Sequence, residues 1–264
     1  MNGESRSGMG SGKTERSAAE AIADCLCVVS DSERDTLRCN EVMSVIIDVV
    51  FRRTGQRMRG KGKTPGYTDG GGYWPLFRTV EESLDLLADS IESSVMKIGR
   101  DAAISIDIAA ADMVDDYGSY RLEGEGNTLS GNAWYDRLSG WIDTYAILMV
   151  EAPFGNNDWG NWGRLTNKAC SKLMVIGDNL YMTDMDSMRK GMARQESNAV
   201  MIKINQIGTV SEILDAITLT RGAGWDQVVS SRSGDTEDVF IAHLAVGINA
   251  GWLHPTRRTD SQVE

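Results

Sequence analysis

Histidine and cysteine are scarce in this chain of 264 residues. The two histidines, His243 and His254, offer no paired spacing that would suit a zinc site. The four cysteines show neither C-x-x-C spacing nor the density of a secreted disulfide scaffold. We therefore expect reduced thiols and a site that is built from other residue types.

Positive charge and long apolar runs are also lacking. Lys and Arg number 27 against 38 Asp and Glu, which gives a formal net charge of −11. An acidic surface repels phosphate, so the balance argues against a nucleic-acid or anionic-membrane partner. No apolar run approaches the roughly 20 residues needed to span a bilayer, and the polar start of the chain has no signal-peptide core. We expect a cytoplasmic protein that binds small molecules.

Apolar residues make up 41% of the chain, enough for one large core. Between residues 42 and 50 they recur at helical spacing, which predicts a helix that stops near Gly55. Thr79 and Thr209 are each followed three residues later by glutamate, as in a capping box. These two pairs predict the starts of two further helices.

Five short apolar runs lie between the helical segments. They cover residues 102–106, 146–150, 172–176, 199–202 and 226–230. Runs of this length without polar alternation are typical of parallel strands that are covered on both faces. Regular strand–helix alternation over this length predicts an α/β fold, with one barrel of the TIM type.

A polar residue ends each of these runs. Asp107, Glu151 and Asp178 follow the first three, Lys203 the fourth, and Ser231, Arg232 and Ser233 the fifth. In a parallel barrel all these ends lie on the face where barrel enzymes build their active sites. Three converging carboxylates repel one another, and an all-oxygen set suits a hard cation such as Mg²⁺. For any single acid, a helix cap or a solvated loop is an equally good interpretation.

The other polar residues at this face suggest acid–base and phosphate chemistry. A lysine beside a metal can serve as a general base, because nearby positive charge and burial lower the pKa of an amine. Arg232 offers a planar fork and Ser233 a hydroxyl to a phosphate group. The pattern therefore predicts a metal-assisted reaction on a phosphorylated small molecule.

Six strings follow one another along the chain in the order of one known family: TDGGGYWP (68–75), SIDIAAAD (105–112), VEAPFGNNDW (150–159), GDNLYMT (177–183), IKINQIGTVSE (202–212) and SSRSGDTEDVFIAHLAVG (230–247). Together they resemble enolase, the phosphopyruvate hydratase of glycolysis. The resemblance covers nearly all of the chain from Arg34 onward. It implies an enolase-like barrel domain over 34–264. Residues 1–33 match the first barrel loop and second strand more weakly.

The resemblance also implies roles for individual residues. Asp107, Glu151 and Asp178 match the magnesium ligands, with Glu151 also facing the substrate, and Lys203 matches the general base. Arg232 and Ser233 match the phosphate-binding pair. The implied reaction is that of a lyase: removal of the proton beside the carboxylate of 2-phosphoglycerate, then loss of the 3-hydroxyl as water to give phosphoenolpyruvate.

The sequence departs from the family at several functional positions. The glutamate that assists departure of the hydroxyl is replaced by Gly70, beside Asp69. Asp24 matches a second catalytic carboxylate weakly. Among the substrate-binding positions, Ser231 stands where the family has histidine, and His254 stands where it has lysine. We therefore expect impaired activity.

The resemblance further implies an incomplete barrel, without the smaller N-terminal domain, the first strand and the closing helix. A homodimer or a partner chain would then cover the exposed sheet edges. Two alternatives to the lyase remain open. One is a non-catalytic protein or fragment that binds Mg²⁺ and a phosphorylated acid. The other is altered chemistry, as in the enolase-like carboxyphosphonoenolpyruvate synthases. Gly70, Ser231 and His254 favour these alternatives.

Overall fold

The computed structural model describes most of the chain after residue 101 and parts of the chain before it. The described residues are 26–27, 52–62, 66–67, 73–74, 77, 79–93, 97–99, 102–122, 125–169, 172–232 and 238–254. The predicted helix over 42–50 lies outside them. So do Asp24, Asp69, Gly70 and Ser233.

Seven strands form one sheet in the order β1-β4-β7-β8-β9-β10-β11. Their bounds are Leu26–Cys27 (β1), Ala103–Asp107 (β4), Ile147–Glu151 (β7), Met174–Gly177 (β8), Ala199–Lys203 (β9), Asp226–Ser230 (β10) and Trp252–His254 (β11). The pairs from β4 to β11 are parallel, whereas β1 pairs with β4 in the antiparallel sense. All five predicted strands are confirmed, each boundary within two residues of its predicted place.

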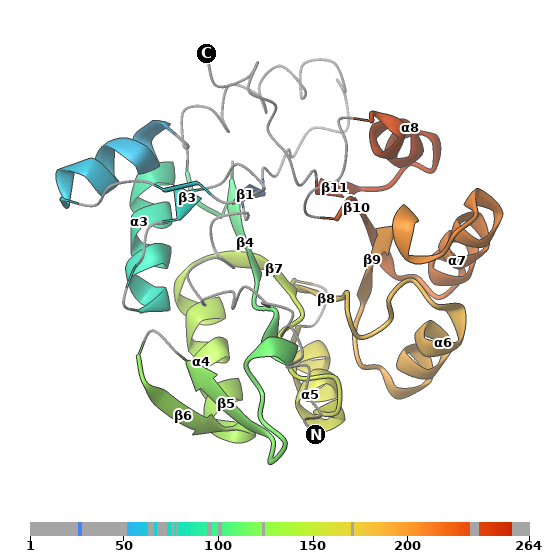
Figure 1. Ribbon diagram of the computed structural model, residues 1–264, viewed down its shortest axis with the longest axis horizontal. Coiled ribbons are helices and arrows are strands. Elements are labelled where there is room, and N and C mark those ends of the chain that lie inside the picture. Colours follow the sequence, from blue (N-terminus) through green and yellow to red (C-terminus); the bar gives the residue numbers. More distant parts are fainter. Residues whose placement is uncertain are drawn as a thin grey trace, which may run out of the picture.

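Helices alternate with these strands and lie around the outside of the curved sheet (Figure 1). They are α3 (Val80–Glu92), α4 (Gly131–Thr144), α5 (Trp159–Ala169), α6 (Met185–Arg194), α7 (Val210–Gly222) and α8 (Phe240–Gly247). Two 3₁₀ turns, η1 (Ala110–Asp112) and η2 (Ile204–Gln206), follow β4 and β9. In the described part of the chain, no helix combines the length and apolar character that a membrane span requires.

Two hairpins lie outside the main sheet in the described part of the chain. β2 (Gly66–Tyr67) pairs with β3 (Tyr73–Trp74), and β5 (Ser119–Leu122) pairs with β6 (Asn127–Ser130). The second hairpin lies between β4 and α4 along the chain, where a simple strand–helix unit would have a short loop. It is therefore an addition to the alternating pattern rather than part of the main sheet.

Both predicted capping boxes begin helices. The Oγ1 atom of Thr79 accepts a hydrogen bond from the Glu82 backbone N–H at 3.3 Å, and α3 begins at the next residue. Thr209 Oγ1 accepts from the Glu212 N–H at 3.2 Å at the start of α7. Each cap satisfies a backbone donor that a helix start leaves unpaired, which is why the pattern is readable from sequence.

The predicted helix stop at Gly55 is wrong. Residues 52–60 are helical, and Gly55 lies buried inside that helix. One turn later, Met58 is fully buried in a cluster with Phe77 and Leu86. Glycine inside a helix costs about 1 kcal/mol relative to alanine. Here the packing of this helix against its neighbours outweighs that cost.

The sheet is buried on both faces. On β9, Val200 and Ile202 belong to a cluster that includes residues of α6, α7 and α8. The alternate residues Ala199 and Met201 belong to a second cluster formed entirely by strand residues. Its members are Met149, Met174, Ile176, Ala199, Met201 and Val228. This double burial explains why the strand sequences show no polar alternation.

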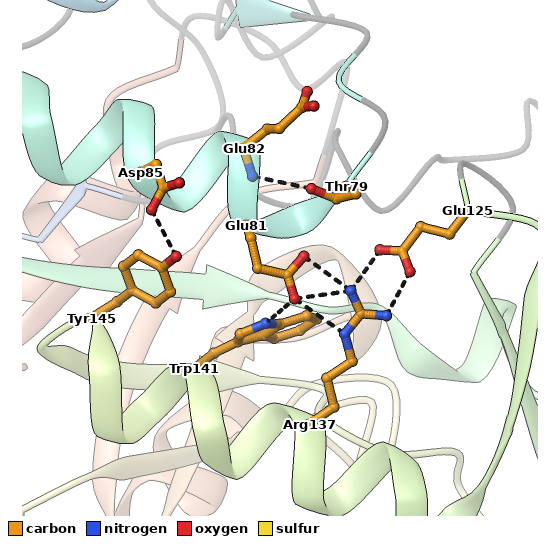
Figure 2. A network of polar contacts seen from close by, with 8 residues as sticks. All are labelled: Thr79, Glu81, Glu82, Asp85, Glu125, Arg137, Trp141 and Tyr145. Carbon is orange, nitrogen blue, oxygen red and sulfur yellow. Dashed lines mark hydrogen bonds and ion pairs between the residues drawn. The ribbon is translucent and has the colours of Figure 1, made fainter.

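A half-buried ion network joins α3, α4 and the turn of the β5–β6 hairpin (Figure 2). Arg137 of α4 contacts Glu81 of α3 at 2.9 Å and Glu125 of the turn at 2.6 Å. Trp141 Nε1 also donates to Glu81 at 2.7 Å. Burial would raise the pKa of Glu81, but the hydrogen bonds from Trp141 and Arg137 outweigh it and lower the pKa. The network fixes the hairpin against the outer helices.

Tyr181 fits between β8 and α6 because two glycines leave room for its ring. Tyr181 is buried, and its hydroxyl lies 2.8 Å from Ser197 Oγ. A Cβ atom added at Gly177, the last residue of β8, or at Gly191 of α6 would overlap the Tyr181 ring. The close approach of strand, ring and helix therefore depends on both glycines.

Gly191→Ala is expected to lower the free energy of unfolding by about 1–3 kcal/mol, because the added methyl group collides with Tyr181. Gly140→Ala is the matched control, since Gly140 of α4 has no atom within 4 Å of an added Cβ. That control should gain about 0.5–1 kcal/mol from the better helix propensity of alanine. Urea unfolding measures both, and shifts of the same sign would contradict the account.

Candidate active site

The last residues of the parallel strands carry the predicted site residues side by side. Asp107 pairs with Glu151 across β4 and β7. Ser230 pairs with Lys203 of β9 on one side and with His254 of β11 on the other. Because these residues are in register at the same ends of parallel strands, their side chains emerge at one edge of the sheet.

Backbone hydrogen bonding continues past the strand ends and holds this edge. The Ile108 N–H donates to the Glu151 carbonyl, and the Ala152 N–H donates to the Ile176 carbonyl, both at 3.0 Å. Ala152, directly after Glu151, has a left-handed backbone with φ 45°. Alanine rarely adopts that conformation, which costs of order 1–3 kcal/mol. The strain lies where the chain presents Glu151.

Asp178 and Lys203 form a close ion pair. Asp178 follows β8 directly, and its Oδ2 atom lies 2.6 Å from Lys203 Nζ. The two side chains are only 10% and 15% exposed. The other oxygen of the carboxylate, Asp178 Oδ1, is buried and has no hydrogen-bond partner. An unsatisfied buried acceptor costs about 1–3 kcal/mol, so this oxygen is available to a donor or a cation.

Glu151 is surrounded by like charge. Burial raises the pKa of its carboxyl well above the ordinary value, and the nearby charges of Asp107 and Asp178 raise it further, while Lys203 opposes them. The Glu151 side chain is 7% exposed. In the metal-free protein this carboxyl therefore retains its proton to a higher pH than an exposed glutamate does.

His254 shows how strongly the sheet is curved. Its Nδ1 atom lies 3.9 Å from Glu151 Oε2. β8, β9 and β10 lie between β7 and β11, so in a flat sheet these residues would be about 19 Å apart at ordinary strand spacing. The short contact means that the strand ends converge, as in a barrel mouth, and that residues from distant strands share one site.

The structure brings part of the predicted site together. Glu151, Asp178, Lys203 and His254 are linked by the contacts above. Asp107 Oδ1 accepts from the Ala109 N–H at 3.0 Å, and its charge acts on Glu151. Among the described residues, no group of three or more histidine, cysteine, aspartate or glutamate side chains is arranged to hold a metal ion. The magnesium ligands therefore remain a prediction.

The predicted substrate-binding residues Ser231 and Arg232 follow β10 directly. Ser231 is buried and Arg232 is exposed. Their position after Ser230 places them next to the strand ends that carry Lys203 and His254. The predicted partner Ser233 lies outside the described residues, as do Asp24 and Gly70.

Sequence reasoning missed Thr183 and Gln206. The Thr183 hydroxyl accepts a hydrogen bond from the Lys203 backbone N–H at 3.2 Å and donates to Gln206 Oε1 at 2.7 Å. Thr183 lies in the GDNLYMT string, but no local pattern marks it, since both of its partners belong to another segment. Only the folded arrangement reveals the contact.

Comparison with known proteins gives the family. The family model for the enolase C-terminal TIM barrel domain matches residues 33–262. The chain is also 41% identical, over 206 residues, to Enolase 1 of Desulfitobacterium hafniense (strain Y51), in an alignment that covers 77% of this chain and 47% of that relative. The chain therefore belongs to the enolase C-terminal barrel family, which confirms the resemblance and the fold class. It spans about half the length of the curated relative.

Glu151→Gln is expected to stabilise the metal-free protein at neutral pH. A carboxyl whose pKa is raised by folding contributes stability below its unfolded pKa and loses it as the pH rises through the folded pKa. The gain from Glu151→Gln should therefore appear as the pH rises above the ordinary pKa of a glutamate carboxyl and grow until the raised pKa of the folded state is passed. The free energy of unfolding in the presence of a chelator, measured as a function of pH, tests this. Asp136→Asn is the control, because Asp136 is exposed. A gain that does not change with pH would contradict the assignment.

Proposed function

We propose that this chain carries the metal-binding and proton-abstracting site of an enolase-type carbon–oxygen lyase that acts on 2-phosphoglycerate. The observation that carries the proposal is the buried pair of Lys203 and Asp178 at the converging strand ends, 2.6 Å apart and in reach of Glu151. Family membership supports lyase chemistry. The substrate and the reaction on it are the proposal.

Asp107, Glu151 and Asp178 would hold Mg²⁺. Their oxygens are the ligand type that this cation prefers, and the pKa of Glu151 is raised by burial and by the charges of Asp107 and Asp178. The unpartnered Asp178 Oδ1 supplies a buried acceptor of the required kind. When bound, the cation would stabilise the negative charge that develops on the substrate carboxylate as the neighbouring proton leaves.

Lys203 would remove the proton at C2 of the substrate. Its ammonium group is held at the mouth by Asp178 and is 15% exposed, so a bound ligand can reach it. A positioned base of this kind contributes about 10²- to 10⁴-fold to a rate. For this step the ammonium group must first release one proton to solvent. The amine lone pair of Lys203 would then take the proton from C2, and the electron pair of the broken C–H bond would pass to the neighbouring carboxylate.

Arg232 and its predicted partner Ser233 would meet the phosphate end of the substrate. Arg232 follows β10, one strand away from Lys203, and its exposed guanidinium can form two parallel hydrogen bonds to a phosphate. Fixing the phosphate there would direct the C2 proton toward Lys203, because both groups extend from adjacent strand ends.

The second half of the reaction lacks its expected acid. Departure of the 3-hydroxyl needs a proton donor, and the sequence has Gly70 at the position where the family has glutamate. We therefore propose that proton abstraction at C2 is retained better than dehydration. The alternative, a protein that binds Mg²⁺ and a phosphorylated acid without turnover, is favoured by the same glycine and by His254, which lies against Glu151.

Mg²⁺ binding provides the first test. Asp178→Ala should reduce Mg²⁺ affinity at least about 10-fold, because an anionic ligand is removed from an incomplete shell. Asp186→Ala is the matched control, since Asp186 has an 80% exposed side chain on the next helix. Calorimetric titration measures both. Equal affinity of the two variants for Mg²⁺ would remove Asp178 from the ligand set.

Exchange of the C2 proton of 2-phosphoglycerate for deuterium provides the second test. Exchange should exceed formation of phosphoenolpyruvate, and Lys203→Ala should lower it about 10²- to 10⁴-fold. Lys172→Ala, at an exposed lysine before β8, is the control. Nuclear magnetic resonance follows the exchange, and absorbance follows the product. Substrate binding without any exchange would favour the non-catalytic alternative.

A further inference from the structure

We propose that Thr183 is a positioning residue that sets the placement of Lys203 relative to Asp178. The inference rests on the proposed function, in which Lys203 is the base. Thr183 is fully buried in the segment between β8 and α6. It touches neither the strand-end acids nor the ammonium group through any described hydrogen bond, so its effect would pass through the backbone of β9.

The backbone at Thr183 is strained. Met182 and Thr183 have φ values of 48° and 57°, which place two consecutive non-glycine residues in the left-handed region. A β-branched residue there is a genuine outlier, because its Cβ substituents crowd the backbone. Such strain persists only where surrounding contacts determine the conformation, and it clusters at functional sites.

The contacts that hold this conformation lead to the base. The Thr183 hydroxyl accepts from the Lys203 N–H at 3.2 Å and donates to Gln206 Oε1 at 2.7 Å. Its one proton and an acceptor lone pair are thus both used. Lys203 is the last residue of β9, and Gln206 ends the 3₁₀ turn η2 that follows it. One hydroxyl therefore fixes the strand end and the turn after it.

The segment that contains Thr183 is also hydrogen-bonded to Asp178. The Met182 N–H donates to the Asp178 carbonyl at 2.9 Å, and the Asp178 carboxylate contacts Lys203 Nζ at 2.6 Å. Asp178 and Lys203 are consequently joined twice, once through their side chains and once through Thr183. A shift of about 1 Å at a reacting group can cost about 10²-fold in rate, so the second link bears directly on catalysis.

Thr220 makes hydrogen bonds similar to those of Thr183 and serves as a control. Thr220 is also fully buried, and its hydroxyl accepts from Gln227 Nε2 at 2.7 Å and donates to the Ala216 carbonyl at 3.0 Å. Gln227 is near the start of β10, in register with Val200, whereas Lys203 is in register with Ser230 at the other end. Thr220→Val therefore removes a similar buried hydroxyl away from the candidate base.

The experiment compares Thr183→Val, Thr183→Ser and Thr220→Val in the full chain. The first readout is hydrogen exchange of the Lys203 amide, which requires neither metal nor substrate. Thr183→Val should speed that exchange about 5- to 10-fold, because the acceptor of the N–H is lost. Thr183→Ser keeps the hydroxyl and should retain the slow exchange. Thr220→Val should leave the Lys203 amide unchanged while lowering the melting temperature to a similar extent.

The second readout is the C2 proton exchange of 2-phosphoglycerate. Thr183→Val should lower its maximal rate about 10- to 100-fold with little change in KM, and Thr183→Ser should restore it. A positioning role also predicts that Thr220→Val has no such effect. If Thr183→Val does not fold, Gln206→Leu removes the nearer of the hydroxyl's two acceptors, leaving the Met201 carbonyl at 3.5 Å, and should lower the same rate in the same direction by a smaller factor.

Two results would overturn the inference, and they differ from a failure of the proposed function. Equal exchange of the Lys203 amide in Thr183→Val and Thr220→Val would show that the hydroxyl does not hold the strand end. An unchanged C2 exchange rate in Thr183→Val would show that placement of Lys203 does not depend on it. Absence of C2 exchange in the unmodified chain would instead overturn the proposed function, while the amide measurement would still decide the structural link.

Discussion

Like charge held close together in a buried mouth is the constraint on which the site depends. Glu151 and Asp178 are both nearly buried, and Asp107 adds its charge from the neighbouring strand. Water cannot screen them well there, so each ionised acid makes the next one more costly to ionise. Among the described residues, Lys203 places a positive group directly on Asp178. The negative charge that Lys203 does not balance contributes to the raised pKa of Glu151. Asp178 Oδ1 is left without a hydrogen-bond partner.

The fold withstands this repulsion because side chains from the surrounding helices and the hairpin form hydrogen bonds to the loop that follows a strand end. The loop after Glu151 is bonded by three aromatic side chains. Trp134 Nε1 donates to the Pro153 carbonyl at 2.9 Å, Trp162 Nε1 donates to the Gly155 carbonyl at 3.1 Å, and the Tyr120 hydroxyl accepts from the Gly155 N–H at 3.0 Å. These bonds come from α4, α5 and the β5–β6 hairpin, which the ion network of Arg137 fixes in turn.

Sequence patterns predicted the strands and helix starts, because interactions between residues close together in the chain determine these features. The five apolar runs became strands, and the two threonine caps began helices, because burial period and cap geometry act over a few residues. The resemblance matched residues 1–33 to a second strand only weakly and did not predict the antiparallel pairing of β1 with β4. The stop at Gly55 failed because packing of Met58 is non-local. Thr183 was missed because its hydrogen-bond partners lie some 20 residues away along the chain.

The cluster formed only by strand residues is rich in methionine: Met149, Met174 and Met201 occupy alternate positions on three neighbouring strands. Thioether side chains are unbranched and polarisable, so they change rotamer and refill space at little cost. The outer clusters, by contrast, contain rigid rings such as Trp134 and Trp162. The cluster between the strands is therefore built from flexible side chains, whereas the clusters under the helices contain rigid ones. Methionine side chains between the strands can therefore adjust to a small shift of a strand more readily than the rings of the outer clusters can.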